Sequence, residues 1–162
     1  MYSVGDHIVH PMHGAGEIRE IVNKRVCGSE QDYYVLKLPV GDMVVMVPVD
    51  RCDMIGVRPV VEPEEANRIL NIFPDLEVAM TQNWNKRYRE NMEKIKSGDL
   101  YSVACVVKGL LCRDNERGLS TGERKMLHTA KQILISELVV SLKSDFEYIE
   151  EKLCASVRVK CP

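Results

Sequence analysis

The stretch Arg58-Pro59-Val60-Val61-Glu62-Pro63 divides the 162-residue chain into two parts with different hydrophobic periodicity. Before it, apolar and polar residues alternate over short runs, which is typical of strands; after it, apolar residues repeat with a helical period. Proline disfavours helix at the preceding residue, so the stretch itself predicts a linker. The sequence therefore predicts an α+β protein with two domains, residues 1–60 and residues 61–162.

The first part of the chain predicts short antiparallel strands separated by glycine-bearing turns. The expected strands cover residues 4–10, 16–22, 33–38 and 43–49. Pro48 cannot donate to a strand ladder, so we expect it at a sheet edge or a strand end. Together these patterns predict either a small antiparallel barrel or a curled sheet.

The second part of the chain predicts helices that begin at recognisable capping residues. Pro63 suits the first position of a helix, Asn83 and Asp99 are good N-caps, and Ser120 with Glu123 forms a capping box. The expected helices cover residues 64–73, 84–97, 100–112, 121–142 and 146–154. This half should therefore be entirely helical.

Composition excludes several classes of protein. No run of about 18 apolar residues is present, and the first residues lack the pattern of a secretion signal, so we expect a cytoplasmic protein. The 6 cysteines contain no CxxC pair and should be reduced thiols rather than zinc ligands. No P-loop or dinucleotide-binding glycine motif is present, so we expect no cofactor.

Charge is unevenly distributed along the chain. The net charge is −2, yet residues 83–131 carry 11 Lys or Arg against 6 Asp or Glu. Local rather than total charge steers a polyanion, and this excess predicts modest, salt-sensitive affinity. Within the basic segment, residues 113–117 could be a DNA contact or a solvated turn between helices.

The only tryptophan, Trp84, lies in the run Asn83-Trp84-Asn85-Lys86-Arg87-Tyr88-Arg89. This places the ring in the first turn of a helix, with three cations close behind it. A large apolar ring beside phosphate-seeking cations is typical of a protein that pushes a side chain against a DNA base step. The alternative is that Trp84 anchors a helix in a core or between domains.

The histidines suggest a metal site only weakly. His7, His10 and His13 recur every third residue. In a strand, His7 and His13 would face one side and His10 the other, so the three would not converge on a metal. His128 is expected to be an ordinary helix residue. A thiol or metal enzyme therefore remains the least favoured class of function.

Taken in order, these residues resemble the CarD family of bacterial transcription regulators, over roughly residues 2–142. The tryptophan run and the segment Arg113-Asp114-Asn115-Glu116-Arg117-Gly118-Leu119-Ser120 are the most specific parts of the resemblance. The opening motifs also resemble the RNA polymerase-interaction domain of transcription-repair coupling factors. The other matching motifs are Val4-Gly5-Asp6, His10-Pro11-Met12-His13-Gly14, Tyr34-Val35-Leu36-Lys37, Val47-Pro48, Ser97-Gly98-Asp99, Glu123-Arg124-Lys125-Met126-Leu127 and Ala130-Lys131-Gln132-Ile133-Leu134.

The resemblance implies a Tudor-like N-terminal β-barrel that binds the RNA polymerase β subunit. It also implies a helical C-terminal domain that contacts promoter DNA through the minor groove and phosphates, with little sequence specificity. The tryptophan would wedge at the upstream edge of the melted bubble and stabilise the open complex. The DNA-binding residues carried over are Trp84 as the wedge, Lys86, Arg87 and Arg89 as phosphate clamps, and Arg124 and Lys125 as weaker candidates.

On the polymerase-binding side, the resemblance points to Lys24, Arg25 and Met46. Family members often carry arginines on this surface. Lys24 keeps the charge without the bidentate fork of arginine, and Met46 carries no charge. The expected protein is a non-enzymatic transcription regulator; the alternative is an adaptor that docks polymerase without a functional DNA contact. Oligomeric state stays open, with a monomer favoured, and residues 143–162 are given a helix and no role.

Overall fold

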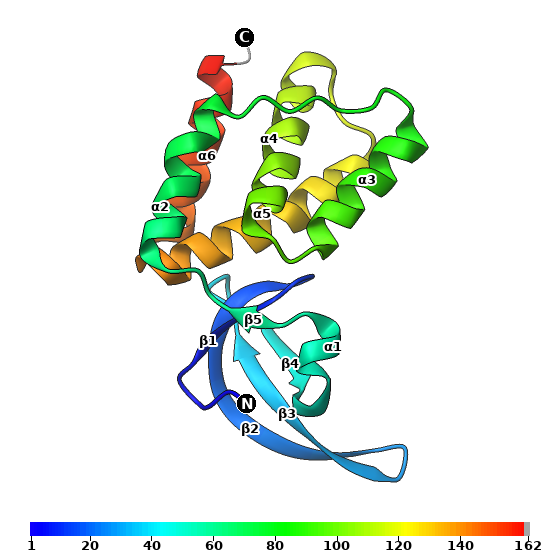
Figure 1. The fold of residues 1–162 in the computed structure, drawn as a ribbon, viewed down its shortest axis with the longest axis vertical. Helices are drawn as coiled ribbons and strands as arrows, with labels where there is room; N and C mark the ends of the chain where they lie inside the picture. The colour runs from blue at the N-terminus through cyan, green and yellow to red at the C-terminus, as the bar shows by residue number, and fades with distance from the viewer. Residues whose placement is uncertain (161–162) are drawn as a thin grey trace.

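The computed structural model describes the backbone of residues 1–160 and the side chains of residues 1–157. A β-sheet formed by the first part of the chain lies at one end of the molecule, and helices form the other end (Figure 1). Within the described residues, no helix has both the length and the apolar character needed to cross a membrane.

The sheet is antiparallel, with five strands in the order β4-β3-β2-β1-β5. The strands are β1 (His7–His10), β2 (Gly14–Val26), β3 (Ser29–Lys37), β4 (Val44–Pro48) and β5 (Arg58–Pro59). β4 and β5 are the two edges, so the sheet is curled and open, which is the second of the two predicted arrangements, and the closed barrel is corrected. The physical reason is that β5 has only 2 residues, one of them a proline without an N–H, and it pairs with β1 alone.

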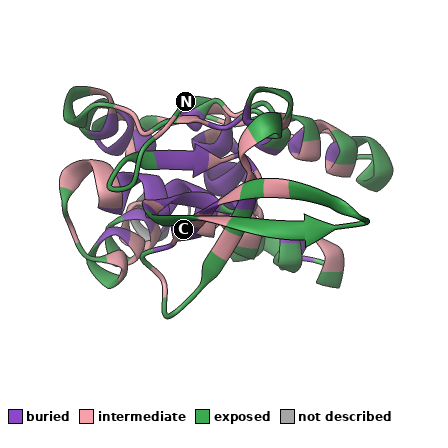
Figure 2. Cartoon of the chain, turned by 90° about the horizontal axis from the view of Figure 1, so that it is seen from below, coloured by how far each residue is buried: buried purple, intermediate pink, exposed green. Residues whose placement is uncertain are grey.

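The sheet carries its own small core on one side. Ile8, Ile18, Tyr34 and Leu36 are buried there, and the short helix α1 (Cys52–Ile55) packs at its margin. A register shift between Ile18 and Glu20 interrupts the β2–β3 ladder, and such bulges increase strand curvature. Beyond this core, the β2–β3 hairpin projects as an exposed two-stranded arm (Figure 2).

Helices joined by loops form the described residues that follow the sheet, as predicted. They are α2 (Pro63–Ile72), α3 (Trp84–Lys96), α4 (Leu100–Arg117), α5 (Thr121–Leu142) and α6 (Phe146–Lys160), with 3-10 turns at Val49–Arg51 and Phe73–Asp75. The predicted caps are confirmed, since Asn83, Asp99 and Ser120 each accept a hydrogen bond from a backbone N–H of the following helix. α4 and α6 run beyond the predicted Cys112 and Cys154; α4 ends only where Gly118 adopts a φ of +77°.

α5 runs along the boundary between the sheet and the remaining helices (Figure 1). Glu137 of α5 is 0% exposed. Its carboxylate accepts hydrogen bonds from both terminal nitrogens of Arg58 at 2.6 and 2.7 Å and from the backbone N–H of Val61 at 2.9 Å. The residue just before it, Ser136, accepts the backbone N–H of Ala15 on its Oγ at 2.9 Å. The predicted linker is therefore held against α5 rather than free in solvent.

Gly14 shows how closely the sheet approaches α5. A Cβ atom added at this glycine would lie 2.3 Å from Ser136 Oγ and 3.3 Å from the Ile133 backbone, and the φ of +102° already disfavours other residues. The close approach depends on glycine and thereby fixes where β2 begins relative to the helical part.

Candidate nucleic-acid interface

Trp84 is the first residue of α3, and its side chain lies at the surface with 42% of its area exposed. Asn83 Oδ1 accepts the Lys86 N–H at 3.0 Å, so the sequence places the ring in the first helical turn by capping that turn. With this exposure, Trp84 is not part of the buried helical core, although its contact with Ser120 still joins the start of α3 to the start of α5.

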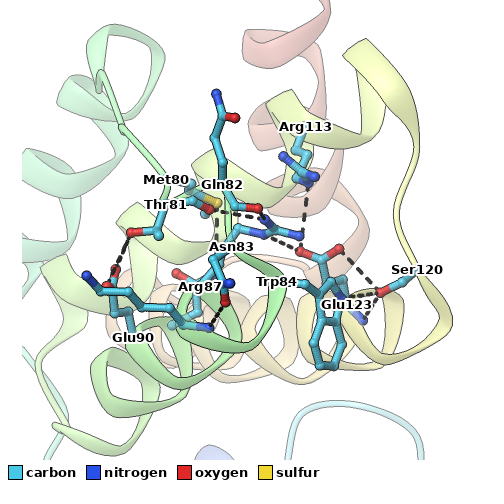
Figure 3. Close-up of polar contacts among 12 residues, drawn as sticks. Met80, Thr81, Gln82, Asn83, Trp84, Arg87, Glu90, Arg113, Ser120 and Glu123 are labelled. Carbon is cyan, nitrogen blue, oxygen red and sulfur yellow. Dashed lines mark hydrogen bonds and ion pairs between the residues drawn. The ribbon is translucent and has the colours of Figure 1, made fainter.

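Three neighbours support the inner side of the indole ring (Figure 3 shows Trp84 between α3 and Ser120). The indole Nε1–H donates to Ser120 Oγ at 3.1 Å. Tyr88, one turn further along α3, stacks on the ring with centroids 5.2 Å apart and planes 19° from parallel. Gly122 lies so close that an added Cβ would be 3.4 Å from Trp84 Cζ2.

Lys86 and Arg89 are exposed on the same helix. Neither forms a salt bridge within the part of the chain whose side chains are described. Unpaired, hydrated cations next to an exposed ring can neutralise phosphates without first breaking an internal ion pair. These two positions therefore fit the predicted role as phosphate clamps.

Arg87 requires a correction. The residue is 2% exposed; its Nε donates to Glu123 Oε2 at 2.8 Å, and its Nη1 donates to the carbonyls of Thr81 and Gln82 at 3.1 and 2.9 Å. A guanidinium enclosed in this way faces protein rather than solvent and is not available to a phosphate. Its role is to tie the start of α3 to the start of α5 (Figure 3).

The buried face of α3 could have been recognised from spacing. Arg87, Asn91 and Ile95 recur every fourth residue and are the buried residues of this helix. Residues four apart lie on one helix face, so the apolar Ile95 marks the face that Arg87 shares. Charged residues are rarely buried without a partner, so a buried Arg87 also predicts an acidic residue on a neighbouring helix to pair with it.

Glu123 is that acidic residue, and its environment holds it ionised. Burial raises the pKa of its carboxyl. The hydrogen bond and charge of Arg87, together with Arg113 and Ser120, lower that pKa by more than burial raises it, so the net shift is downward. Arg113 Nε lies 3.8 Å from Glu123 Oε2 and is buried without a hydrogen-bond partner. Glu123 is thus the only carboxylate that an ion pair links to these two arginines in the described part of the chain.

The remaining predicted DNA-binding residues lie on α5. Arg124 and Lys125 are exposed in its first two turns, just after the Ser120 cap. Arg124 also lines a depression of about 380 Å³, together with Asp114 of α4 and with His128 and Lys131 of α5. Residues 113–117 are helical, so the expectation of a solvated turn there is corrected.

The three predicted polymerase-binding residues are all exposed but do not form one cluster. Lys24 and Arg25 lie on the projecting arm, opposite Gln31 and Glu30 of β3. Met46 lies on the edge strand β4, opposite Val35 and 36% exposed. Met43 and Val44 beside it are 43% and 51% exposed, so this edge offers apolar side chains and unpaired backbone groups to a partner.

The histidines lie differently from the prediction, without forming a metal site. β1 ends at His10 and the following turn brings His13 back beside it, with ring centroids 4.5 Å apart, so the predicted opposite placement of these two is wrong. His10 Nδ1 accepts the Met12 N–H at 3.1 Å, and burial together with His13 lowers the pKa of His10 to about 4.

Among the described residues, no group of at least 3 possible metal ligands is found. The cysteines of that part of the chain are free thiols, and Cys161 lies outside it.

Comparison with known proteins agrees with this arrangement. Residues 2–61 match the CarD-like/TRCF RID domain, the RNA polymerase-interaction domain shared with transcription-repair coupling factors, and residues 68–154 match the CarD C-terminal domain. The protein named "Putative transcription factor YdeB" of Bacillus subtilis (strain 168) is 39% identical over 140 residues, which cover 86% of this chain and 92% of the relative. Both halves match in the order of the family, and the chain belongs to the CarD family of transcription factors.

Proposed function

We propose that the protein binds the RNA polymerase β subunit through its sheet domain and stabilises the promoter open complex through Trp84. The observation that carries the proposal is the exposed indole at the start of α3, with unpaired Lys86 and Arg89 beside it. In this mechanism the ring wedges into the minor groove at the upstream edge of the bubble, while the two cations hold phosphates.

The wedge would act by differential affinity. A ring that fits distorted DNA better than straight duplex shifts the equilibrium toward the melted promoter, and it shifts it only by that difference. A difference of about 1.4 kcal/mol changes the population of a minor open state about tenfold. Two clamping cations contribute affinity that falls with salt but carry no sequence information.

Arg87 has no direct part in this proposal, and Arg124 and Lys125 have a secondary one. Because the Arg87 guanidinium is enclosed by Glu123 and two carbonyls, it would serve by holding the two helix starts together. Arg124 and Lys125, exposed on the adjoining helix start, would extend the phosphate contacts.

Polymerase docking is supported by the match of the sheet domain and by the apolar edge strand β4. An exposed edge adds a strand to, or receives one from, a partner sheet, with backbone hydrogen bonds supplying affinity. Replacing Met46 with arginine tests the use of this edge, because a guanidinium adds the forked donor often found there in the family. Tighter capture of a purified β-subunit fragment by Met46→Arg supports this docking surface; unchanged capture contradicts it.

The lifetime of the open complex on a linear promoter, measured after a competitor challenge, tests the proposed mechanism. Trp84→Ala should retain capture of the β fragment and shorten the lifetime about tenfold or more, as expected for an aromatic anchor. Lys86→Gln with Arg89→Gln should reduce the salt dependence by roughly one unit of slope per cation. Full activity of Trp84→Ala would instead indicate an adaptor that docks polymerase without a functional DNA contact.

A further inference from the structure

Ser120 is the residue that joins the candidate DNA-binding ring to the helix on the other side of the interface. Its hydroxyl lies 36 positions from Trp84 in the chain, yet accepts the indole N–H at 3.1 Å. The same oxygen caps α5 by accepting the Glu123 N–H at 3.2 Å and lies 3.3 Å from Glu123 Oε1. One side chain thus serves both the helix start and the ring.

The hydroxyl has its full set of hydrogen bonds in this arrangement. A serine hydroxyl offers one donor and two acceptor positions. The donor is directed at Glu123 Oε1, and the acceptors receive the Trp84 indole and the Glu123 backbone N–H. Donation to Glu123 orients the oxygen lone pairs, so the acceptor that meets the indole is fixed in direction as well as in position.

The contacts form a closed circuit between the two helix starts (Figure 3). Trp84 donates to Ser120, and Ser120 donates to Glu123 Oε1. The other oxygen of that carboxylate, Oε2, accepts from Arg87 Nε of α3 at 2.8 Å, which closes the ring of contacts. Arg87 is one turn from Trp84 on the same helix. The ion pair sets the separation of the helices, and the serine then determines where the indole nitrogen lies.

We propose that Ser120 is a positioning residue that holds the Trp84 ring, in the free protein, in the orientation that it uses on DNA. The indole N–H bond to Ser120 and the stack on Tyr88 fix the ring from two directions. A ring held in advance loses less rotational freedom on binding, which raises affinity without a new contact. The functional part of this inference rests on the proposed role of Trp84.

Ser120→Gly isolates the hydroxyl from its capping role. Glycine is a nearly adequate N-cap, so the change removes the partner of the indole at little cost to α5. Asp99→Gly is the matched control, because Asp99 caps α4 through the Ser102 N–H and, among the described side chains, forms no hydrogen bond with Trp84. Ser120→Thr keeps a hydroxyl and should restore wild-type behaviour.

Two readouts are compared in the full-length protein. Trp84 is the only tryptophan, so time-resolved fluorescence anisotropy reports the motion of this ring alone in the free protein. Ser120→Gly should give the ring wider internal rotation than Asp99→Gly, with equal thermal midpoints. It should also shorten the open-complex lifetime about three- to tenfold, the effect of losing one hydrogen bond of ordinary strength.

The possible results separate this inference from the proposed function. Unchanged anisotropy in Ser120→Gly overturns the positioning role. Wider rotation with an unchanged lifetime also overturns it, provided that Trp84→Ala shortens the lifetime. If Trp84→Ala has no effect on the lifetime, the proposed function fails, and the anisotropy alone decides whether Ser120 holds the ring.

Discussion

Two arginine–glutamate pairs fix how parts of this molecule are arranged, and they lie in different places. Arg58 and Glu137 join the sheet domain to α5, with a bidentate contact at 2.6 and 2.7 Å and an arginine that is 28% exposed. Arg87 and Glu123 join α3 to α5 inside the helical domain, with side chains 3% and 4% exposed. One pair sets the orientation of two domains, and the other shapes the surface that carries Trp84.

The comparison shows that the same kind of ion pair can fix the orientation of two domains in one place and the packing of two helices in another. A buried ion pair contributes little net stability compared with apolar residues of the same shape, yet losing one partner is costly because the other charge remains buried. Such pairs therefore specify an arrangement more than they stabilise the fold. Our hypothesis is that breaking the inner pair, Arg87–Glu123, disrupts the helical domain. Breaking the outer pair, Arg58–Glu137, should leave polymerase capture intact and weaken only the stabilisation of the open complex.

Glu123→Ala should have the largest effect. The change leaves Arg87 buried without its carboxylate, removes the nearest acidic partner of Arg113 and takes away the capping-box side chain of α5. We expect a loss of about 3–5 kcal/mol in the free energy of unfolding, measured by urea denaturation. Glu65→Ala, which breaks an exposed pair with Arg68, is the control and should change stability little. A loss no larger than that of the control would show that the inner pair is not structural.

Arg58→Ala should cost less stability and change function more selectively. Partial exposure lets water reach the Glu137 carboxylate once the guanidinium is gone, so we expect about 2 kcal/mol. Capture of the β fragment should persist, because the sheet domain keeps its own core. The open-complex lifetime should fall, because the ring is no longer held at a fixed distance from the docked edge. A normal lifetime with this variant would show that domain orientation is not used.

Acid should affect the inner pair in a defined pH window. The pKa of the Glu123 carboxyl is lowered in the folded protein, so its contribution to stability is complete above the ordinary pKa of glutamate. That contribution is lost as the pH falls through the lower, folded pKa. Urea midpoints measured between pH 6 and pH 3 should therefore fall less steeply in Glu123→Gln than in wild type. Parallel curves would contradict a charged Glu123 in the fold.

Gly122→Ala should have the smallest effect. The added Cβ would lie 3.4 Å from Trp84 Cζ2, an ordinary contact, and alanine favours helix over glycine. We expect a gain of about 0.5 kcal/mol in stability and an open-complex lifetime within about twofold of wild type. A large loss of lifetime would indicate that the ring must move toward α5 on binding DNA.

Much of the fold could be predicted from local signals. The caps at Asn83, Asp99 and Ser120 gave the starts of three helices because capping depends on residues within one turn. The ends of the helices and the closure of the sheet were harder to predict from the sequence. α4 continues to Gly118 because no residue in its last turn opposes helix, and the sheet stays open because β5 is too short to reach β4.

The candidate site was only partly visible in the sequence. The exposure of Lys86 and Arg89 is what a charged helix start predicts, whereas the sequence left the exposure of Trp84 open. The spacing of Arg87 with Asn91 and Ile95 indicates its buried face, but it does not identify its partner Glu123, 36 residues away. Long-range partners of this kind are set by how helices pack, which local pattern does not specify.

In the proposed mechanism, the Trp84 ring meets the DNA at the upstream edge of the bubble. It is tested most directly by placing the fluorescent base 2-aminopurine at that edge in a polymerase–promoter complex. Its emission should change on addition of wild-type protein and of the Asp99→Gly control, and should not change with Trp84→Ala at a concentration that saturates the β subunit. An equal change with Trp84→Ala, or no change with wild type, would contradict the account.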